Sequence, residues 1–129
     1  MTATYNNGLY RKWDESGQLW LEETYKNGLK HGLYRMWYLN GQLCIECTYK
    51  NGLKHGLYRE WHSNGQLQFM RTYECGKLNG LNREWFSDGQ LSMKYTFKDG
   101  KQHGLFSFWL ENGELGFELD YENGKIIKR

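Results

Sequence analysis

The stretch GLYRMWYLNGQLCIECTYKNGLKH, residues 32–55, decides the fold, because the chain repeats its pattern every 24 residues. Three glycine positions per copy account for 15 of the 16 glycines in the 129 residues. A fixed period of this length is typical of an array in which each unit stacks on its neighbours. We therefore expect a single domain, 1–129, whose function lies on an extended surface. The copies are 8–31, 32–55, 56–79, 80–103 and 104–127.

Each copy has the pattern of a β-hairpin. In copy 32–55, two runs rich in aromatic and apolar residues are separated by Asn40-Gly41, a turn signal. A second turn, Lys50-Asn51-Gly52, leads into the next copy. Five such copies predict an all-β fold, an elongated single-layer antiparallel β-meander of five 24-residue hairpins, with about ten strands.

The register of the hairpin depends on its first turn. In the second run, Leu43 and every second residue up to Tyr49 share one apolar face. In the first run, Arg35 and Trp37 share a face. A two-residue turn would place Trp37 on the face opposite Leu43, whereas a three-residue loop, residues 39–41, would bring Trp37 beside Leu43. Burial favours the loop, because it unites tryptophan and leucine on the apolar face.

Composition and charge argue against nucleic-acid binding, export through a signal peptide and a membrane span. The formal net charge is only +2, so we expect no nucleic-acid partner. No N-terminal apolar run resembles a signal peptide, and no apolar stretch is long enough for a membrane span. Three cysteines in such a chain favour a reducing, cytoplasmic location, and packaging into a virus particle is compatible with it. Copy 104–127 is acidic, with five carboxylates against Lys125, which suits a solvated cap or a basic partner.

The units YKNGLKHGLYR and W-x-x-NGQL resemble MORN repeats, in particular the variant MORN repeats. Such repeats occur in bacterial proteins described as antitoxin components, and similar arrays are common in large DNA viruses. The resemblance covers nearly the whole chain and implies hairpins in one elongated antiparallel sheet. It also implies scaffolding, dimerisation and contact with protein or phospholipid. The first three copies carry Leu-Tyr-Arg-x-Trp where the usual repeat has Tyr-x-Gly-x-Trp, so no binding residues are transferred.

Cysteine and histidine positions offer little for metal binding. Cys44 and Cys47 have C-x-x-C spacing, but residues three apart on an extended strand point to opposite faces. His31, His55 and His103 recur at one position of the repeat, so neighbouring members lie two strands apart, about 9–10 Å, too far to share one zinc. We expect reduced thiols, exposed turn imidazoles and no metal or other cofactor.

Nothing in the pattern indicates catalysis. No glycine-rich loop precedes a helix, and no serine has a histidine and a carboxylate placed beside it by the repeat. Glu22 and Glu23 are adjacent, so on a strand they point to opposite faces and cannot share a proton. We expect no catalytic residues and no enzyme.

Two columns of side chains recur with the repeat and are candidates for structure or interaction. Each arginine of one column precedes a tryptophan of the other by two residues, so cation–π packing is favoured over phosphate binding. Ile126 and Ile127 stand near the C-terminus, where two adjacent isoleucines are expected to be packed. The columns are Trp13, Trp37, Trp61, Trp85 and Trp109, and Arg11, Arg35, Arg59 and Arg83.

The leading hypothesis is a non-enzymatic scaffold that mediates protein–protein interaction. An open sheet has two unpaired edges, expected near Thr4–Trp13 and near Leu115–Tyr121, and its apolar face has no covering layer. We therefore expect the partner to be the chain itself, as a homodimer, or another protein. The alternatives are a peripheral module that binds anionic phospholipid, and an antitoxin-like protein that binds a toxin.

Overall fold

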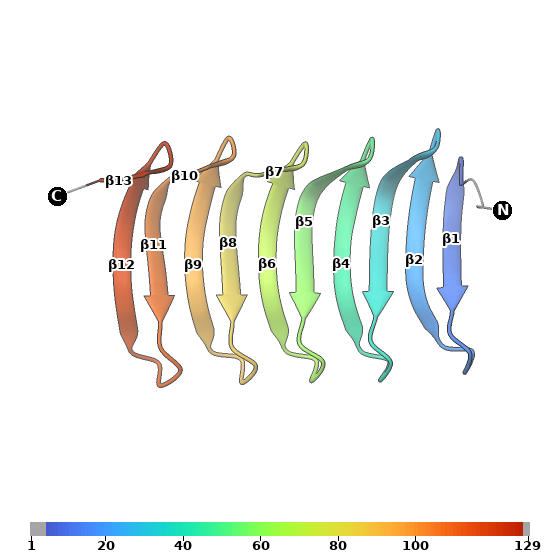
Figure 1. Ribbon diagram of the computed structural model, residues 1–129, viewed down its shortest axis with the longest axis horizontal. Helices are drawn as coiled ribbons and strands as arrows, with labels where there is room; N and C mark the ends of the chain where they lie inside the picture. Colours follow the sequence, from blue (N-terminus) through green and yellow to red (C-terminus); the bar gives the residue numbers. More distant parts are fainter. Residues whose placement is uncertain (1–4, 128–129) are drawn as a thin grey trace.

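The computed structural model describes residues 5–127, which form one open antiparallel sheet of 13 strands without a helix. The long strands follow one another in sequence order from the N-terminal to the C-terminal end of the array (Figure 1). No second layer lies on either face in the view of Figure 1. The expected β-meander of hairpins is therefore confirmed, and Thr4 lies outside the described residues.

Ten long strands carry the five hairpins, and three two-residue strands complete the sheet. The first strands of the copies are β1 (Gly8–Trp13), β3 (Leu29–Trp37), β5 (Leu53–Trp61), β8 (Gly80–Trp85) and β11 (Gly104–Trp109). The second strands are β2 (Leu19–Lys26), β4 (Leu43–Lys50), β6 (Leu67–Glu74), β9 (Leu91–Lys98) and β12 (Leu115–Glu122). The short strands are β7 (Lys77–Leu78), β10 (Lys101–Gln102) and β13 (Lys125–Ile126).

The first turn of each hairpin is the three-residue loop that burial favoured. Tyr38 N donates to Gln42 O at 2.8 Å, and Gly41 N donates to Tyr38 O at 3.0 Å. Gly41 has φ 85°, the left-handed conformation that glycine adopts without a steric penalty. The loop makes Trp37 the partner of Leu43, as expected.

The second turn is a two-residue turn with both residues at positive φ. Asn51 and Gly52 have φ 51° and 83° between the paired Lys50 and Leu53. Asparagine tolerates this conformation better than most residues, which explains its recurrence here. Cys75 occupies the same place in the next copy with φ 50°.

A bulge next to the first loop shows that the expected assignment of side chains to the two faces was wrong in part. Between Met36 and Trp37 the register shifts by one residue, so Met36 pairs with Ile45 and Arg35 pairs with Glu46. Arg35 therefore does not share the face of Ile45, as a plain register would require. Leu43 stays beside Trp37, because the extra residue lies between Leu43 and Ile45.

The sheet thus has two different faces. The arginine face carries the arginine and tryptophan columns with Glu22 and Glu46, and the tyrosine face carries Tyr34, Tyr58, Tyr95 and their neighbours. Burial is sparse in a single layer. Within the described residues the buried apolar side chains are Leu21, Cys47, Tyr58 and Tyr95. The buried polar ones are Glu22, Glu23, Asn82, Ser92 and Ser107.

Candidate functional site

The arginine column forms an ion-pair ladder with two glutamates. Glu22 on β2 lies between β1 and β3, and it contacts Arg11 at 2.9 Å and Arg35 at 3.5 Å. Glu46 on β4 accepts hydrogen bonds from Arg35 at 2.9 Å and from Arg59. Arginine and glutamate therefore alternate across five neighbouring strands, so each of these three arginines has at least one carboxylate partner. Sequence reasoning missed the glutamates, although Glu22 and Glu46 are 24 residues apart and hence share one repeat position.

The two arginines on Glu46 shift the titration of that carboxyl group. Burial by itself would raise the pKa of Glu46, but the hydrogen bonds and charges of Arg35 and Arg59 outweigh it. The pKa of Glu46 is therefore lower than usual, and the carboxylate is charged at neutral pH.

The ladder stops in the C-terminal half of the sheet. The residue opposite Arg83 on one side is Met70, and on the other side it is Lys94. Lys94 in turn faces Ser107. Arg83 and Lys94 are therefore adjacent cations with no glutamate between them on this face.

The tryptophan column is less buried than a core would be. Trp13 is 57% exposed, and the other four tryptophans are half-buried. The guanidinium of Arg59 lies over the ring of Trp61, at 5.5 Å from the centroid, as the expected cation–π contact requires. Trp109 and Leu91 line one shallow cavity, so the tryptophan of one copy and the leucine of the copy before it border the same space.

The tyrosine face is held together by rings and lysines. Lys54 Nζ lies 4.6 Å from the ring centroid of Tyr58 and 5.2 Å from that of Tyr73, and Lys30 makes the same pair of contacts one copy earlier. The Tyr58 hydroxyl donates to Glu60, and burial together with this carboxylate raises the pKa of Tyr58. These contacts were not expected from the sequence.

Both cysteines of the C-x-x-C spacing lie near Tyr34, so the plain alternation that was expected does not describe them. Cys44 is itself the extra residue of the bulge, so the usual alternation does not hold at its position. Burial raises the pKa of Tyr34, and Cys47 and Cys44 both raise it further, so both thiols lie near this ring. Burial also raises the pKa of Cys47 to about 11, so its thiol stays protonated. Within residues 5–127, no three His, Cys, Asp or Glu side chains are grouped to hold a metal ion.

The repeat position of His31 and His55 accepts a hydrogen bond from the backbone of a two-residue turn. Asn51 N donates to His31 Nδ1 at 3.4 Å, and Cys75 N donates to His55 Nδ1 at 3.2 Å. Asn79 fills the same role for Asp99 N at 3.3 Å. These side chains therefore fasten each turn to the next one and are half-buried, rather than the exposed imidazoles that the sequence suggested.

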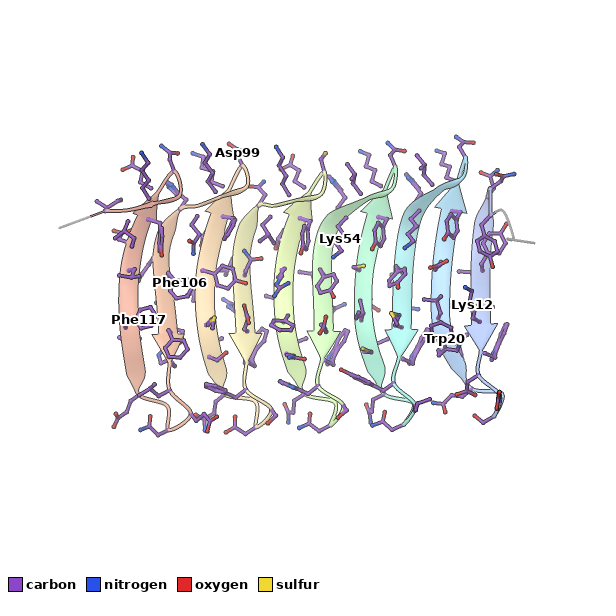
Figure 2. The ribbon with its side chains drawn as sticks, in the orientation of Figure 1. Lys12, Trp20, Lys54, Asp99, Phe106 and Phe117 are labelled. Carbon is purple, nitrogen blue, oxygen red and sulfur yellow. The ribbon has the colours of Figure 1, made fainter. Side chains whose placement is uncertain are left out.

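The two ends of the array differ in shape and chemistry. β1 forms the N-terminal edge, and β12 forms the C-terminal edge with β13 pairing only at Tyr121 and Glu122 (Figure 1). Ile126 is 55% exposed and Ile127 is half-buried, so the expected packing of both isoleucines is not present in the single chain. Phe106 and Phe117 lie side by side on the neighbouring strands β11 and β12 (Figure 2), with ring centroids 5.9 Å apart.

A comparison with protein families agrees with this repeat geometry. The model of the MORN repeat variant matches residues 6–27, 30–51, 54–74 and 78–99, more than half of the chain. The chain belongs to the MORN-repeat family. A comparison with curated proteins gave no match. MORN repeats are generally found in scaffold or binding proteins.

The fifth copy of this MORN-repeat protein, 104–127, lies beyond the matched stretches but keeps the same hairpin register. Gly104 pairs with Tyr121, as Gly32 pairs with Tyr49 in the second copy. No helix in the described residues is long and apolar enough to span a bilayer.

Proposed function

We propose that this MORN-repeat protein is a non-enzymatic scaffold that binds protein partners, itself included, through its uncovered sheet. The smallest self-assembly would be a homodimer. An antitoxin-like role would be one case of binding another protein, and it would use the same surface.

The observation that carries this proposal is the exposure of large apolar side chains on a sheet with no covering layer. Four apolar residues are buried in the described part of the chain, whereas eleven large hydrophobic side chains are exposed. Exposed apolar side chains on a sheet that no second layer covers are candidates for an interaction surface, whereas Leu39 and Leu110 of the exposed set lie in loops. The exposed set is Leu9, Trp13, Leu29, Leu39, Leu53, Leu57, Leu105, Leu110, Leu115, Phe117 and Ile126.

The C-terminal end of the tyrosine face is the best-defined contact patch. Phe117 stacks on Phe108 at 5.2 Å between ring centroids and on Phe106 at 5.9 Å, yet it is 47% exposed. Exposed aromatic rings that are held rigidly by neighbours are typical anchors of protein interfaces. The patch therefore suits an apolar segment of a partner.

Light scattering of the purified protein tests the self-association that this function includes. The molar mass is expected to rise above 15.5 kDa with concentration. Phe117→Ser is expected to weaken the association, whereas Leu39→Ser, in a loop and 85% exposed, is the matched control with no effect. A mass of 15.5 kDa at every concentration would reject self-association.

The phospholipid alternative has one observation in its favour and one against it. Glu22 and Glu46 already form ion pairs with Arg11, Arg35 and Arg59, so these arginines compete with a carboxylate partner for any phosphate group. Arg83 and Lys94 form the remaining basic pair. Co-sedimentation with phosphatidylserine vesicles tests this alternative. Binding that is lost in the double variant Arg83→Gln, Lys94→Gln would favour it. No binding, or binding to neutral vesicles alone, would reject it.

A further inference from the structure

The contact between neighbouring copies follows a register rule that repeats along the sheet. We call the side of a second strand that faces the following copy its outer side. On the outer side of β2, Glu22 is paired with Arg35 of the next copy. On the outer side of β4, Glu46 is paired with Arg59 in the same way. Each of these glutamates contacts an arginine of the strand that follows it.

Glu118 has the same position on β12, but within residues 5–127 no strand pairs with β12 at this place. Glu118 lies 96 residues, four repeats, after Glu22. It is exposed, its inner neighbour is Ser107 rather than an arginine, and no ion pair involves it within the described residues. In that part of the chain, no strand pairs with the outer side of residues 115–119. The last second strand therefore presents a glutamate without its arginine.

Arg11 on β1 is the complementary case. Arg35 contacts two glutamates, Glu22 and Glu46, and its side chain is 37% exposed. Arg11 contacts Glu22 alone within residues 5–127, and its side chain is 48% exposed. The outer side of Arg11 therefore lacks the glutamate that a preceding copy would supply.

The apolar side chains at the two edges match in the same register. Trp13 is 57% exposed and Leu115 is 47% exposed, more than their counterparts inside the array. Inside the array, Leu91 of one copy and Trp109 of the next line a common cavity. A strand like β1 placed on β12 would reproduce this contact between Trp13 and Leu115.

We propose that β1 of a second copy adds to the outer side of β12, so that two chains join head to tail into one continuous sheet. Arg11 of the incoming chain lies opposite Glu118, and Trp13 lies beside Leu115. The Arg–Glu ladder then continues from Glu118 through Arg11 to Glu22 of the second chain. This inference rests on the proposed self-association and specifies its interface.

The charges of the edge strands favour pairing of β1 with β12 over two-fold pairing of two β12 strands or two β1 strands. Two β12 edges would bring together two copies of the acidic hairpin 104–127, which carries five carboxylates against Lys125. Two β1 edges would bring together Arg11 and Lys12 of both chains. Like charges directly opposite one another destabilise strand pairing, whereas the head-to-tail contact pairs opposite charges.

β13 limits the strength of this contact. Lys125 and Ile126 pair with Glu122 and Tyr121, where the incoming chain would bring the residues that precede its Gly8. The same preceding residues are tied to their own chain, because Gly28 N donates to Asn6 O at 2.9 Å. β13 is held by two residue pairs and by the hydrogen bond that Ile127 N donates to Asp120 O at 2.8 Å, and this short segment must give way to the incoming chain. The association is therefore weak and depends on concentration.

Sedimentation equilibrium of three variants tests the head-to-tail interface. Glu118→Arg and Arg11→Glu are each expected to raise the dissociation constant of wild-type association about tenfold or more, because each creates a like-charge pair. An equimolar mixture of the two variants is expected to associate again, since Arg at position 118 meets Glu at position 11. Glu111→Arg, in the exposed loop of the same copy, is the control for net charge and is expected to have no effect. If circular dichroism shows that the Arg11→Glu variant is unfolded, the Arg11→Gln variant is used in its place.

The outcomes separate this inference from the proposed function. Weakening by both single variants, with recovery in the mixture, supports head-to-tail pairing. Association that responds to Glu118→Arg but not to Arg11→Glu points to pairing of two β12 edges and overturns it. Association that neither variant changes also overturns it and leaves self-association standing. A wild type of 15.5 kDa at every concentration rejects both.

Discussion

Arg35 Nε donates to Glu46 Oε2 at 2.9 Å, across the hairpin formed by β3 and β4. Glu46 also accepts a hydrogen bond from Arg59 of the next copy, so one carboxylate joins two repeats. The side chain of Glu46 is only 16% exposed, which makes this pair stronger than a typical surface ion pair.

Glu46→Gln is expected to lower the free energy of unfolding by about 1–2 kcal/mol, because charge-assisted hydrogen bonds to partly buried arginines are lost. The pKa of Glu46 is lowered in the folded state, so its stabilisation is present above the unfolded pKa and is lost as the pH falls through the folded pKa. Urea unfolding at neutral and at acidic pH measures both effects. Glu111→Gln, in an exposed loop, is the control, and an equal effect of both variants at neutral pH would contradict the prediction.

Trp61→Ala is expected to cost about 1–3 kcal/mol, less than for a fully buried tryptophan, because Trp61 is half-buried. Trp13→Ala, at the exposed edge, is the matched comparison and should cost clearly less. Both values come from urea unfolding followed by circular dichroism. An equal decrease in the free energy of unfolding for both variants would show that Trp61, in the middle of the array, is packed no better than Trp13 at the edge.

Gly116→Ala is expected to destabilise the protein by about 1–3 kcal/mol through a steric clash. A Cβ at position 116 would lie 2.7 Å from Phe108 Cδ1, and this is the one glycine of the chain without a positive φ. Combining it with Phe108→Leu removes the ring and should recover part of the loss in thermal unfolding. No loss in the single variant would mean that Phe108 moves aside without cost.

Cys75→Asn is expected to stabilise the protein by about 0.5–1 kcal/mol, because asparagine tolerates the left-handed conformation of this turn better than cysteine. Cys75 has φ 50° and is exposed, so no packing is lost. Asn51→Cys places the same residue in the equivalent turn and should have the opposite effect. A change of the same sign in both variants, measured by thermal unfolding, would refute the argument from backbone conformation.

Alkaline solution is expected to unfold the protein as tyrosines of the tyrosine face ionise. Burial raises the pKa of Tyr49 to about 12, and burial with a hydrogen bond to Glu84 raises the pKa of Tyr95 to about 12. Because the folded pKa is the higher one, this stabilisation is complete below pH 10, the ordinary tyrosine value, and is lost as the pH rises through about 12. Thermal unfolding across this range measures it, with tyrosinate absorbance as a second signal. A melting temperature that does not fall across this window would contradict the prediction.

The repeat period and the turn residues predicted most of the fold from the sequence. The loop with Gly41 and the turn with Asn51 and Gly52 are local structures, determined by the backbone conformations that a few adjacent residues prefer. The partner of Trp37 followed from that loop. The column positions of arginine, tryptophan and histidine could likewise be read from the period.

Only the tertiary structure decided which face each side chain occupies and which partner it meets. One extra residue between Leu43 and Ile45 moved Arg35 away from the face of Ile45 and placed it opposite Glu46. The same bulge made Cys44 an unpaired extra residue, so alternation did not predict its position relative to Cys47. A bulge depends on the fit between two strands, so alternation along one strand does not reveal it. The repeating hairpin could be predicted from the sequence because turns are local, whereas the ladder, the faces and the unmatched edges arise from pairing between strands.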